Sequence, residues 1–315
     1  MSALISHRML PRGAKSGQFL VTGRAGAAGL LPDTSGNITN LLQDSAFLNR
    51  IKSNEKEVFL DGPIISATMI AEFDELRAQY DVRSGHAAEL GKGVAEEYDI
   101  RALLMLANGA RSATLITATG PDNDRAGTRV VDADWNSNGA SAVATLFRLK
   151  RAFDAKFVPQ SDRHVIITPE CYSNLAQQTD LVNRDWVAGK NGDFAAGTVE
   201  RVAGFQLHIS ARLKSADNAT GLGDLSAANR SGTLNIFSGG TAPATANGGG
   251  AVTAGHYENT VALALHASGV GSVDMLGMSL ESDYRIEHQS TLIVAKKLCG
   301  ISWLRPEACI EITDV

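Results

Sequence analysis

Apolar residues form one long helical stripe between positions 81 and 108. The stripe consists of Leu90, Val94, Tyr98, Ala102 and Met105. Their steps of three or four residues match the period of an α-helix. The stripe predicts a helix of about 26 residues and roughly 39 Å, which ends at Asn108 and Gly109. Because Gly91 and Gly93 each cost about 1 kcal/mol relative to Ala in a helix interior, we expect a sheet packed along this helix to stabilise it.

A second, shorter helix is predicted immediately before the long one. Its apolar positions are Met69, Ile70, Phe73, Leu76 and Tyr80. This spacing fits one face of a helix, and the Ser66 hydroxyl is placed to cap the helix N-terminus. The short helix is expected to end near Asp81, where the long helix begins.

Two extended segments frame a long excursion near the N-terminus. Strand-like patterns occur in QFLVTGRAGAAGLL and EKEVFLDG, and turn formers such as Asp33, Gly36 and Asn37 lie between positions 32 and 54. This arrangement predicts a long hairpin-like loop with a mobile tip. Because a loop of this length has little core of its own, we expect it either to serve an interaction or to be disordered.

The rest of the chain alternates between helical and strand patterns. A helix is predicted over positions 139 to 158, and the run HVIIT then predicts a buried strand that leads through Pro169 into another helix. Positions 232 to 255 are rich in Gly, Ala and Thr, which predicts a flexible surface loop after one short strand. Alternating apolar residues after position 260 indicate further strands. No internal repeat is found.

Composition places the chain among ordinary globular proteins. Of its 315 residues, 44% are hydrophobic and 20% charged, which argues against disorder and against a membrane protein. The N-terminus lacks the apolar region of a signal peptide, so synthesis and folding in a cytoplasm are expected. Cys171, Cys299 and Cys309 are widely separated and include no C-x-x-C pair, so we interpret them as packing thiols.

Charge is distributed unevenly although the net charge is only -5. The first 32 residues carry basic side chains and no acid, whereas eight acids lie from Glu72 to Asp99. The sequence therefore nominates seven residues as inter-subunit or DNA-facing contacts: Arg8, Arg12, Lys15, Arg24, Glu72, Glu89 and Glu96. The basic residues suit DNA phosphates or the acidic helical surface of a neighbouring subunit, and we favour the neighbouring subunit.

No motif nominates an enzyme. The glycines from Gly23 to Gly29 lack the dinucleotide-binding spacing, and the segment from Gly85 to Gly93 departs from a phosphate loop and lies in a predicted helix. The seven histidines never occur four residues apart, and neither H-E-x-x-H nor G-x-S-x-G is present. We therefore predict no catalytic, cofactor-binding or metal-binding residue and no cofactor.

Several colinear patches resemble the major capsid proteins of short-tailed, double-stranded-DNA phages. The resemblance lies in KSGQFLVTGR, in F-L-D-G followed by Y-D-V-R-S, in SDRHVIITPECYSNL and in the closing IVAKKLCGISWLRPEACIEI with its L-R-P-E-A signature. These patches span residues 15 to 311. Positions 183 to 257 carry little that matches.

The resemblance implies an α+β fold, the tailed-phage major capsid fold. Its expected parts are an N-terminal arm at 1–15, an extended loop at 16–62, a peripheral domain with the spine helix at 63–134, an axial domain at 135–257 and closing peripheral strands at 258–315. The arm, excursion, long helix, mixed middle and returning strands occur in the same order in the patterns described above.

The function implied by this resemblance is structural. Copies would form hexamers and pentamers that build an icosahedral head around the double-stranded DNA genome, with assembly in the host cytoplasm and final location in the virion. The expected partners are other copies, a scaffolding protein, a portal, packaged DNA and possible decoration proteins, with no membrane. The alternatives are an encapsulin-type shell, which has the same fold, and a soluble nucleotide-binding enzyme.

Overall fold

Two sheets and a long helix organise the chain. The computed structural model describes residues 2–22, 53–78, 81–112, 126–178, 192–193, 198–219, 221–222 and 257–315. The helices are α1 (Glu72–Arg77), α2 (Val82–Arg111), α3 (Gly139–Ala155) and α4 (Pro169–Ala176), with short 3-10 turns η1 (Ser2–Leu4), η3 (Ile286–His288) and η4 (Pro306–Ala308). The strands are β1 (Ser6–Met9), β2 (Ser16–Thr22), β3 (Ser53–Phe59), β4 (Ile64–Ala71), β5 (Thr128–Val131), β6 (Arg163–Ile167), β7 (Gly192–Asp193), β8 (Thr198–Val199), β9 (Arg201–Val202), β10 (Phe205–Ile209), β11 (Thr260–His266), β12 (Val270–Arg285), β13 (Ser290–Trp303) and β14 (Cys309–Thr313).

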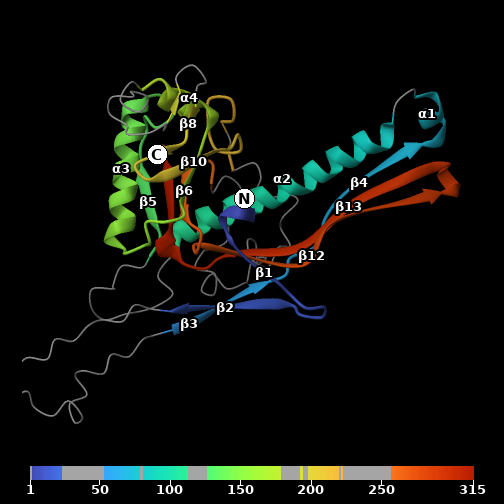
Figure 1. The fold of residues 1–315 in the computed structure, drawn as a ribbon, viewed down its shortest axis with the longest axis horizontal. Helices are drawn as coiled ribbons and strands as arrows, with labels where there is room; N and C mark the ends of the chain where they lie inside the picture. The colour runs from blue at the N-terminus through green and yellow to red at the C-terminus, as the bar shows by residue number, and fades with distance from the viewer. Residues whose placement is uncertain are drawn as a thin grey trace, which may run out of the picture.

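The strands form a four-stranded sheet, a six-stranded sheet and two small pairs. The four-stranded sheet has the order β1-β12-β13-β4, and the six-stranded sheet has the order β5-β14-β11-β6-β10-β9. The remaining strands pair as β2-β3 and β7-β8. In Figure 1, α2, β4, β12 and β13 project together away from the six-stranded sheet. We call this projection the arm; it is distinct from the N-terminal arm expected at 1–15. This combination confirms the expected mixed α+β architecture.

The long helix α2 confirms the prediction from the apolar stripe. It begins after Asp81, whose side chain accepts a hydrogen bond from the Ser84 backbone N–H at 3.2 Å. All five stripe residues are buried. The helix continues to Arg111, three residues beyond the predicted end, and every residue from Ile100 to Ala110 is buried. A single stripe accounts for the first half of α2, whereas the second half is covered on all sides.

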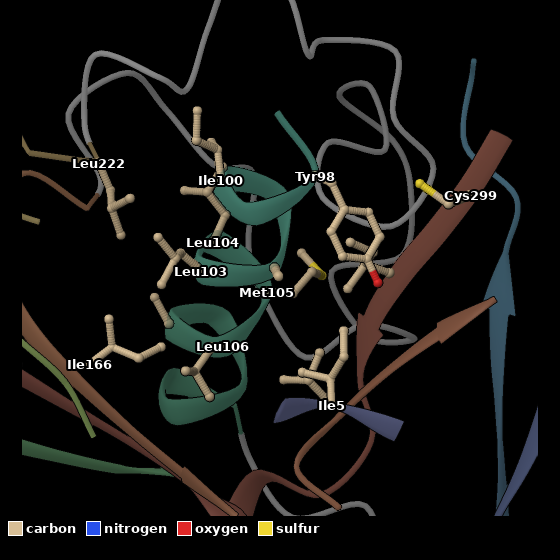
Figure 2. Packing of buried hydrophobic residues seen from close by; sticks show 14 of the residues in the cluster. Ile5, Tyr98, Ile100, Leu103, Leu104, Met105, Leu106, Ile166, Leu222 and Cys299 are labelled. Carbon is tan, nitrogen blue, oxygen red and sulfur yellow. The ribbon is translucent and has the colours of Figure 1, made fainter. Parts of the chain in front are cut away.

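The second half of α2 is buried because both main sheets pack against it. One hydrophobic cluster contains residues of α2 together with Ile293 and Cys299 of the four-stranded sheet and Ile166 and Leu263 of the six-stranded sheet. In Figure 2, Tyr98 and Cys299 lie on one side of the helix, and Ile166 lies on the other. The helix is therefore the shared core of the two sheets.

The predicted short helix from Ser66 is wrong over its first half. Residues Ile64–Ala71 form strand β4, which pairs antiparallel with β13 from Ile64 opposite Lys297 to Ala71 opposite Ser290. Alternate residues such as Ile64 and Ile70 are buried, which a strand under α2 requires. Only Glu72–Arg77 is helical, and Ser66 lies within a strand instead of capping a helix. Pairing with β13 has overridden a helical spacing.

The two predicted extended segments form the antiparallel hairpin β2-β3, which pairs from Ser16 opposite Phe59 to Thr22 opposite Ser53. One face of the hairpin packs on the chain's own four-stranded sheet, where Val58 contacts Val273 and Leu304. Gly17 permits this approach, because an added Cβ would lie 2.6 Å from Val273 Cγ1. The predicted mobile tip and the Gly23–Gly29 segment lie outside the described residues.

The six-stranded sheet collects strands from three separate stretches of sequence. Strand β5 precedes residue 135, β6, β9 and β10 lie between 135 and 257, and β11 and β14 follow residue 257. The predicted helix at 139–158 is α3, which ends at Ala155, and the predicted HVIIT strand and the helix after it are β6 and α4. The predicted loop at 232–255 lies outside the described residues.

A buried carboxylate joins α2 to the six-stranded sheet. Glu311 of β14 is fully buried and accepts hydrogen bonds from Arg111 at 2.5 and 2.6 Å and from the Thr260 hydroxyl at 2.5 Å. Arg129 of β5 lies 3.3 Å from the same carboxylate. A buried charge with these partners fixes the C-terminal end of α2 against β5, β11 and β14.

Replacing Glu311 with Gln is expected to destabilise the fold by about 3–5 kcal/mol, because it leaves the largely buried Arg111 guanidinium, whose side chain is 16% exposed, without its counter-charge. The matched control is Glu281→Gln, which breaks the exposed ion pair with Lys296 and should cost less than about 1 kcal/mol. Urea unfolding midpoints measure both variants. An equal decrease of the urea midpoint in the two variants would contradict the role given to Glu311.

Candidate assembly surfaces

Three of the four most exposed large apolar side chains among the described residues lie at the far end of the arm. Phe73 and Leu76 of α1 are 68% and 77% exposed, and Ile286 of η3 is 80% exposed. No residue of α1 is buried, and α1 lies at the tip of the arm in Figure 1. Large apolar side chains exposed together at one end of a protein are typical of interaction sites. We call Phe73, Leu76 and Ile286 the arm tip.

Polar contacts hold the arm tip in place. Tyr284 of β12 donates a hydrogen bond to Glu72 at 2.7 Å, so the first residue of α1 is tied to the neighbouring hairpin. Arg83 of α2 pairs with Glu75 at 2.5 Å. The arm tip is thus presented on a fixed surface although its own side chains are not packed in a core.

The face of the arm sheet opposite α2 also exposes apolar residues along β4 and β13. Pairing between β4 and β13 places Met69 beside Leu292 and Ala67 beside Val294, on the face opposite α2. Ile65 and Met69 on this face are 59% and 49% exposed. We call this surface the outer sheet face. Exposed apolar residues also occur on the outward side of the β2-β3 hairpin, where Leu20 is 64% exposed.

The basic residues nominated from sequence lie next to the hairpin. Strand β1 pairs in parallel with β12 of the same chain, and His7 lies 2.9 Å from Asp274. Arg8 donates a hydrogen bond to the Gln18 carbonyl of β2 at 2.6 Å. Arg12 and Lys15 are exposed in the turn that follows β1. Arg24 lies outside the described residues.

The acidic residues nominated from sequence are spread along the arm. Glu72 is at the arm tip and accepts the Tyr284 hydrogen bond. Glu89 pairs with Lys92 at 2.5 Å, and Glu96 pairs with Arg212 at 2.6 Å. The acids therefore do not lie in one cluster with the basic residues, and both sets remain predicted contacts with a neighbouring subunit or DNA.

The described residues offer little for catalysis. No group of three or more His, Cys, Asp or Glu among them is arranged to hold a metal ion. Gly85 and Gly93 lie inside α2, where a phosphate loop cannot form. Burial raises the pKa of Cys171 and of Cys299 to about 12, so both are protonated thiols at neutral pH. No helix among the described residues is long and apolar enough to cross a membrane.

A pair of histidines was not predicted from the sequence. His164 of β6 and His208 of β10 are hydrogen-bonded through Nδ1 and Nε2 at 3.1 Å, because the two strands pair in parallel. One ring donates and the other accepts, so the contact requires at least one neutral histidine. The two histidines are 44 residues apart, so no sequence motif connects them. They are brought into contact by the register in which β6 and β10 pair.

Burial lowers the pKa of both histidines in this pair. The shift of His164 is caused first by desolvation and is opposed by Asp162, with a smaller contribution from His266 that also lowers the pKa. Desolvation and then the neighbouring His164 lower the pKa of His208. Each histidine therefore binds a proton less readily in the folded chain than in the unfolded chain.

Comparison with known proteins identifies the class and the family. Solved capsid structures share the fold: cyanophage P-SCSP1u has a TM-score of 0.70 and 26% identity over 98% of this chain and 86% of that chain, and the mature capsid of bacteriophage PhiM1 has a TM-score of 0.66 and 16% identity over 98% and 85%. The fold is therefore that of tailed-phage major capsid proteins. Residues 39–313 match the Gp10A-like major capsid protein family, and the chain belongs to that family.

Two curated relatives agree with this assignment. The major capsid protein of Escherichia phage T7 is 27% identical over 93% of this chain and 81% of its own length. The major capsid protein of Enterobacteria phage T3 is 28% identical over 93% and 80%. The protein is thus a structural component of the virion capsid that self-associates into capsomers and forms a phage head. This assignment confirms the resemblance and the prediction of no enzyme, and it excludes both alternatives.

Acid is expected to weaken the fold through His164 and His208. Because their folded-state pKa values lie below the unfolded value of about 6.5, their contribution to stability is complete above that value and is lost as pH falls below it. The melting temperature should fall between about pH 7.5 and about pH 5.5. His208→Gln should reduce this fall, whereas the control His288→Gln, on the exposed η3 turn, should leave it unchanged. An unaltered pH dependence in His208→Gln would contradict this account.

Proposed function

We propose that copies of this protein form hexamers and pentamers that close into an icosahedral head around double-stranded DNA. The observation that carries the proposal is the arm, whose tip and outer sheet face expose apolar residues that no described segment of the chain covers. Interfaces of obligate assemblies often exceed about 2,000 Å² and are rich in apolar residues. Contacts between subunits would give these surfaces the burial that the single chain does not provide.

The β2-β3 hairpin is proposed as the base of an extended loop that reaches an adjacent subunit. Val58 on its inner side is buried against the chain's own sheet, which fixes the direction in which the hairpin leaves the body. Leu20 and Phe59 are exposed on its outer side. These two apolar side chains suit contact with the exposed Ile65 and Met69 on the outer sheet face of a neighbouring copy, because such contact removes apolar surface from water.

The domain division also remains a proposal and is adjusted by the strand pairing. We assign the peripheral domain to α2 with the four-stranded sheet and the axial domain to the six-stranded sheet with α3 and α4. Strands β5, β11 and β14 lie outside 135–257 in sequence but pair within the six-stranded sheet. The chain would therefore cross between the two domains more often than boundaries at 63–134, 135–257 and 258–315 imply.

Partners other than the protein itself are proposed from charge and from the assembly. Exposed Arg12 and Lys15 suit either acids of a neighbouring subunit or DNA phosphates, which basic side chains neutralise without reading sequence. A scaffolding protein would guide assembly, a portal would occupy one vertex, and decoration proteins would bind the finished head. Assembly would take place in the host cytoplasm.

Negative-stain microscopy and sedimentation of the purified protein, with and without a coexpressed candidate scaffold, test the proposed function. Closed shells or capsomer-sized rings are expected. A stable monomer or dimer under every condition would contradict the proposal. Shells that hold DNA after coexpression with packaging proteins would support the proposal that the head encloses double-stranded DNA.

Removing the apolar arm tip should block assembly without unfolding the subunit. The double variant Phe73→Ser/Leu76→Ser changes exposed side chains, so its unfolding free energy should stay within about 0.5 kcal/mol of the original. Sedimentation should show loss of shells or rings. Val315→Ser is the matched control, because Val315 is 75% exposed but lies at the chain terminus away from the arm. Normal shells from the double variant would contradict the role of the arm tip.

A further inference from the structure

The outer edge of β4 is an unprotected strand edge. Strand β4 is the last strand of its sheet and pairs only with β13, in a register without a bulge. Its eight residues, IISATMIA, include no charged residue and no proline. Among the described residues, no hydrogen bond reaches its other side. Natural edge strands usually carry charge, proline or a bulge, because a free edge recruits another strand.

The other edge strands of four or more residues in the described chain are protected. Strand β2 is also uncharged, but Arg8 donates its side-chain hydrogen bond to the Gln18 carbonyl at 2.6 Å. Strand β3 carries Glu55 and Glu57. Strand β1 includes Arg8 itself, and β5 has four residues including Arg129. The edge of β4 therefore differs from these strands and is suited to pair with an uncharged strand.

We infer that β4 pairs antiparallel with β4 of a second copy, centred on Ala67, and joins two arm sheets across a twofold axis. The inference rests on the proposed icosahedral assembly, in which adjacent capsomers meet across twofold axes. A twofold contact uses the same surface on both subunits. An uncharged strand can pair with the same strand of a second copy without charge repulsion. Pairing of β4 with β3 of another copy would instead leave the carboxylates of Glu55 and Glu57 without a basic partner, because β4 has no charged residue.

The residue pattern of β4 selects the register. With Ala67 opposite Ala67, Ile65 lies opposite Met69 on the outer sheet face, and Ile64 lies opposite Ile70 on the side of α2. Directly opposite residues have Cβ atoms about 4.5–5.5 Å apart, close enough for these apolar pairs to contact. Moving the centre by one residue would instead place Ile70 opposite Ser66. The centred register buries the exposed Ile65 and Met69 together.

Disulfide trapping tests the inference. Ala67→Cys would place two thiols opposite each other at the centre of the paired strands, at a separation that a disulfide can span. The native cysteines are all buried, so they should contribute no background. After oxidation of assembled shells with copper phenanthroline, most Ala67→Cys chains should migrate as covalent dimers on a non-reducing gel. Ala71→Cys is the control, because the centred register places residue 71 opposite Pro63.

A mixed assembly tests the register itself. Ile65→Cys shells and Met69→Cys shells should each remain monomeric after oxidation, whereas shells assembled from both variants should contain covalent dimers. Shells that form normally but yield no Ala67→Cys dimer would overturn the inference and leave the capsid function intact. Equal crosslinking of Ala67→Cys and Ala71→Cys would overturn it as well. Failure of the unmodified protein to form shells would contradict the proposed function and the inference together.

Discussion

The burial of the second half of α2 between two sheets is the constraint on which the rest of the structure depends. From Ile100 to Ala110 the helix has no exposed residue, and small residues allow the close contact. At Gly109 an added Cβ would lie 3.0 Å from both Trp303 Cβ and Cys309 Sγ. This packing, together with the buried Glu311 and its arginine partner, makes one body of the two sheets. It also fixes the direction of the arm.

The first half of α2 has a different environment, because only one sheet packs against it. Leu90, Val94 and Tyr98 are buried against the four-stranded sheet, while the other sides of the helix meet solvent. The helix covers only one face of the arm sheet, so the outer sheet face stays exposed. The arm tip lies beyond the part that α2 covers and is exposed as well. In a monomeric protein such an arm is a liability for aggregation. In a shell-forming protein the same arm supplies the surface for contacts between copies.

The sequence predicted the elements that depend on local pattern, such as α2, the β2-β3 strands, α3 and the Pro169 helix. It failed at β4, since Met69, Ile70, Phe73 and Leu76 fit a helical period and only pairing with β13 makes Ile64–Ala71 a strand. It could not reveal the His164–His208 contact, the membership of β5, β11 and β14 in one sheet, or the free edge of β4. Each of these depends on register between distant segments, which periodicity does not encode.

Hydrogen–deuterium exchange on assembled shells and on unassembled subunits tests the central claim that the arm is completed by other copies. The account predicts that assembly slows exchange in β4, α1 and the β2-β3 hairpin. Exchange in β6 and in the second half of α2 should stay equally slow in both states, because the single chain already buries them. Equal exchange of the arm in shells and in subunits would contradict the claim.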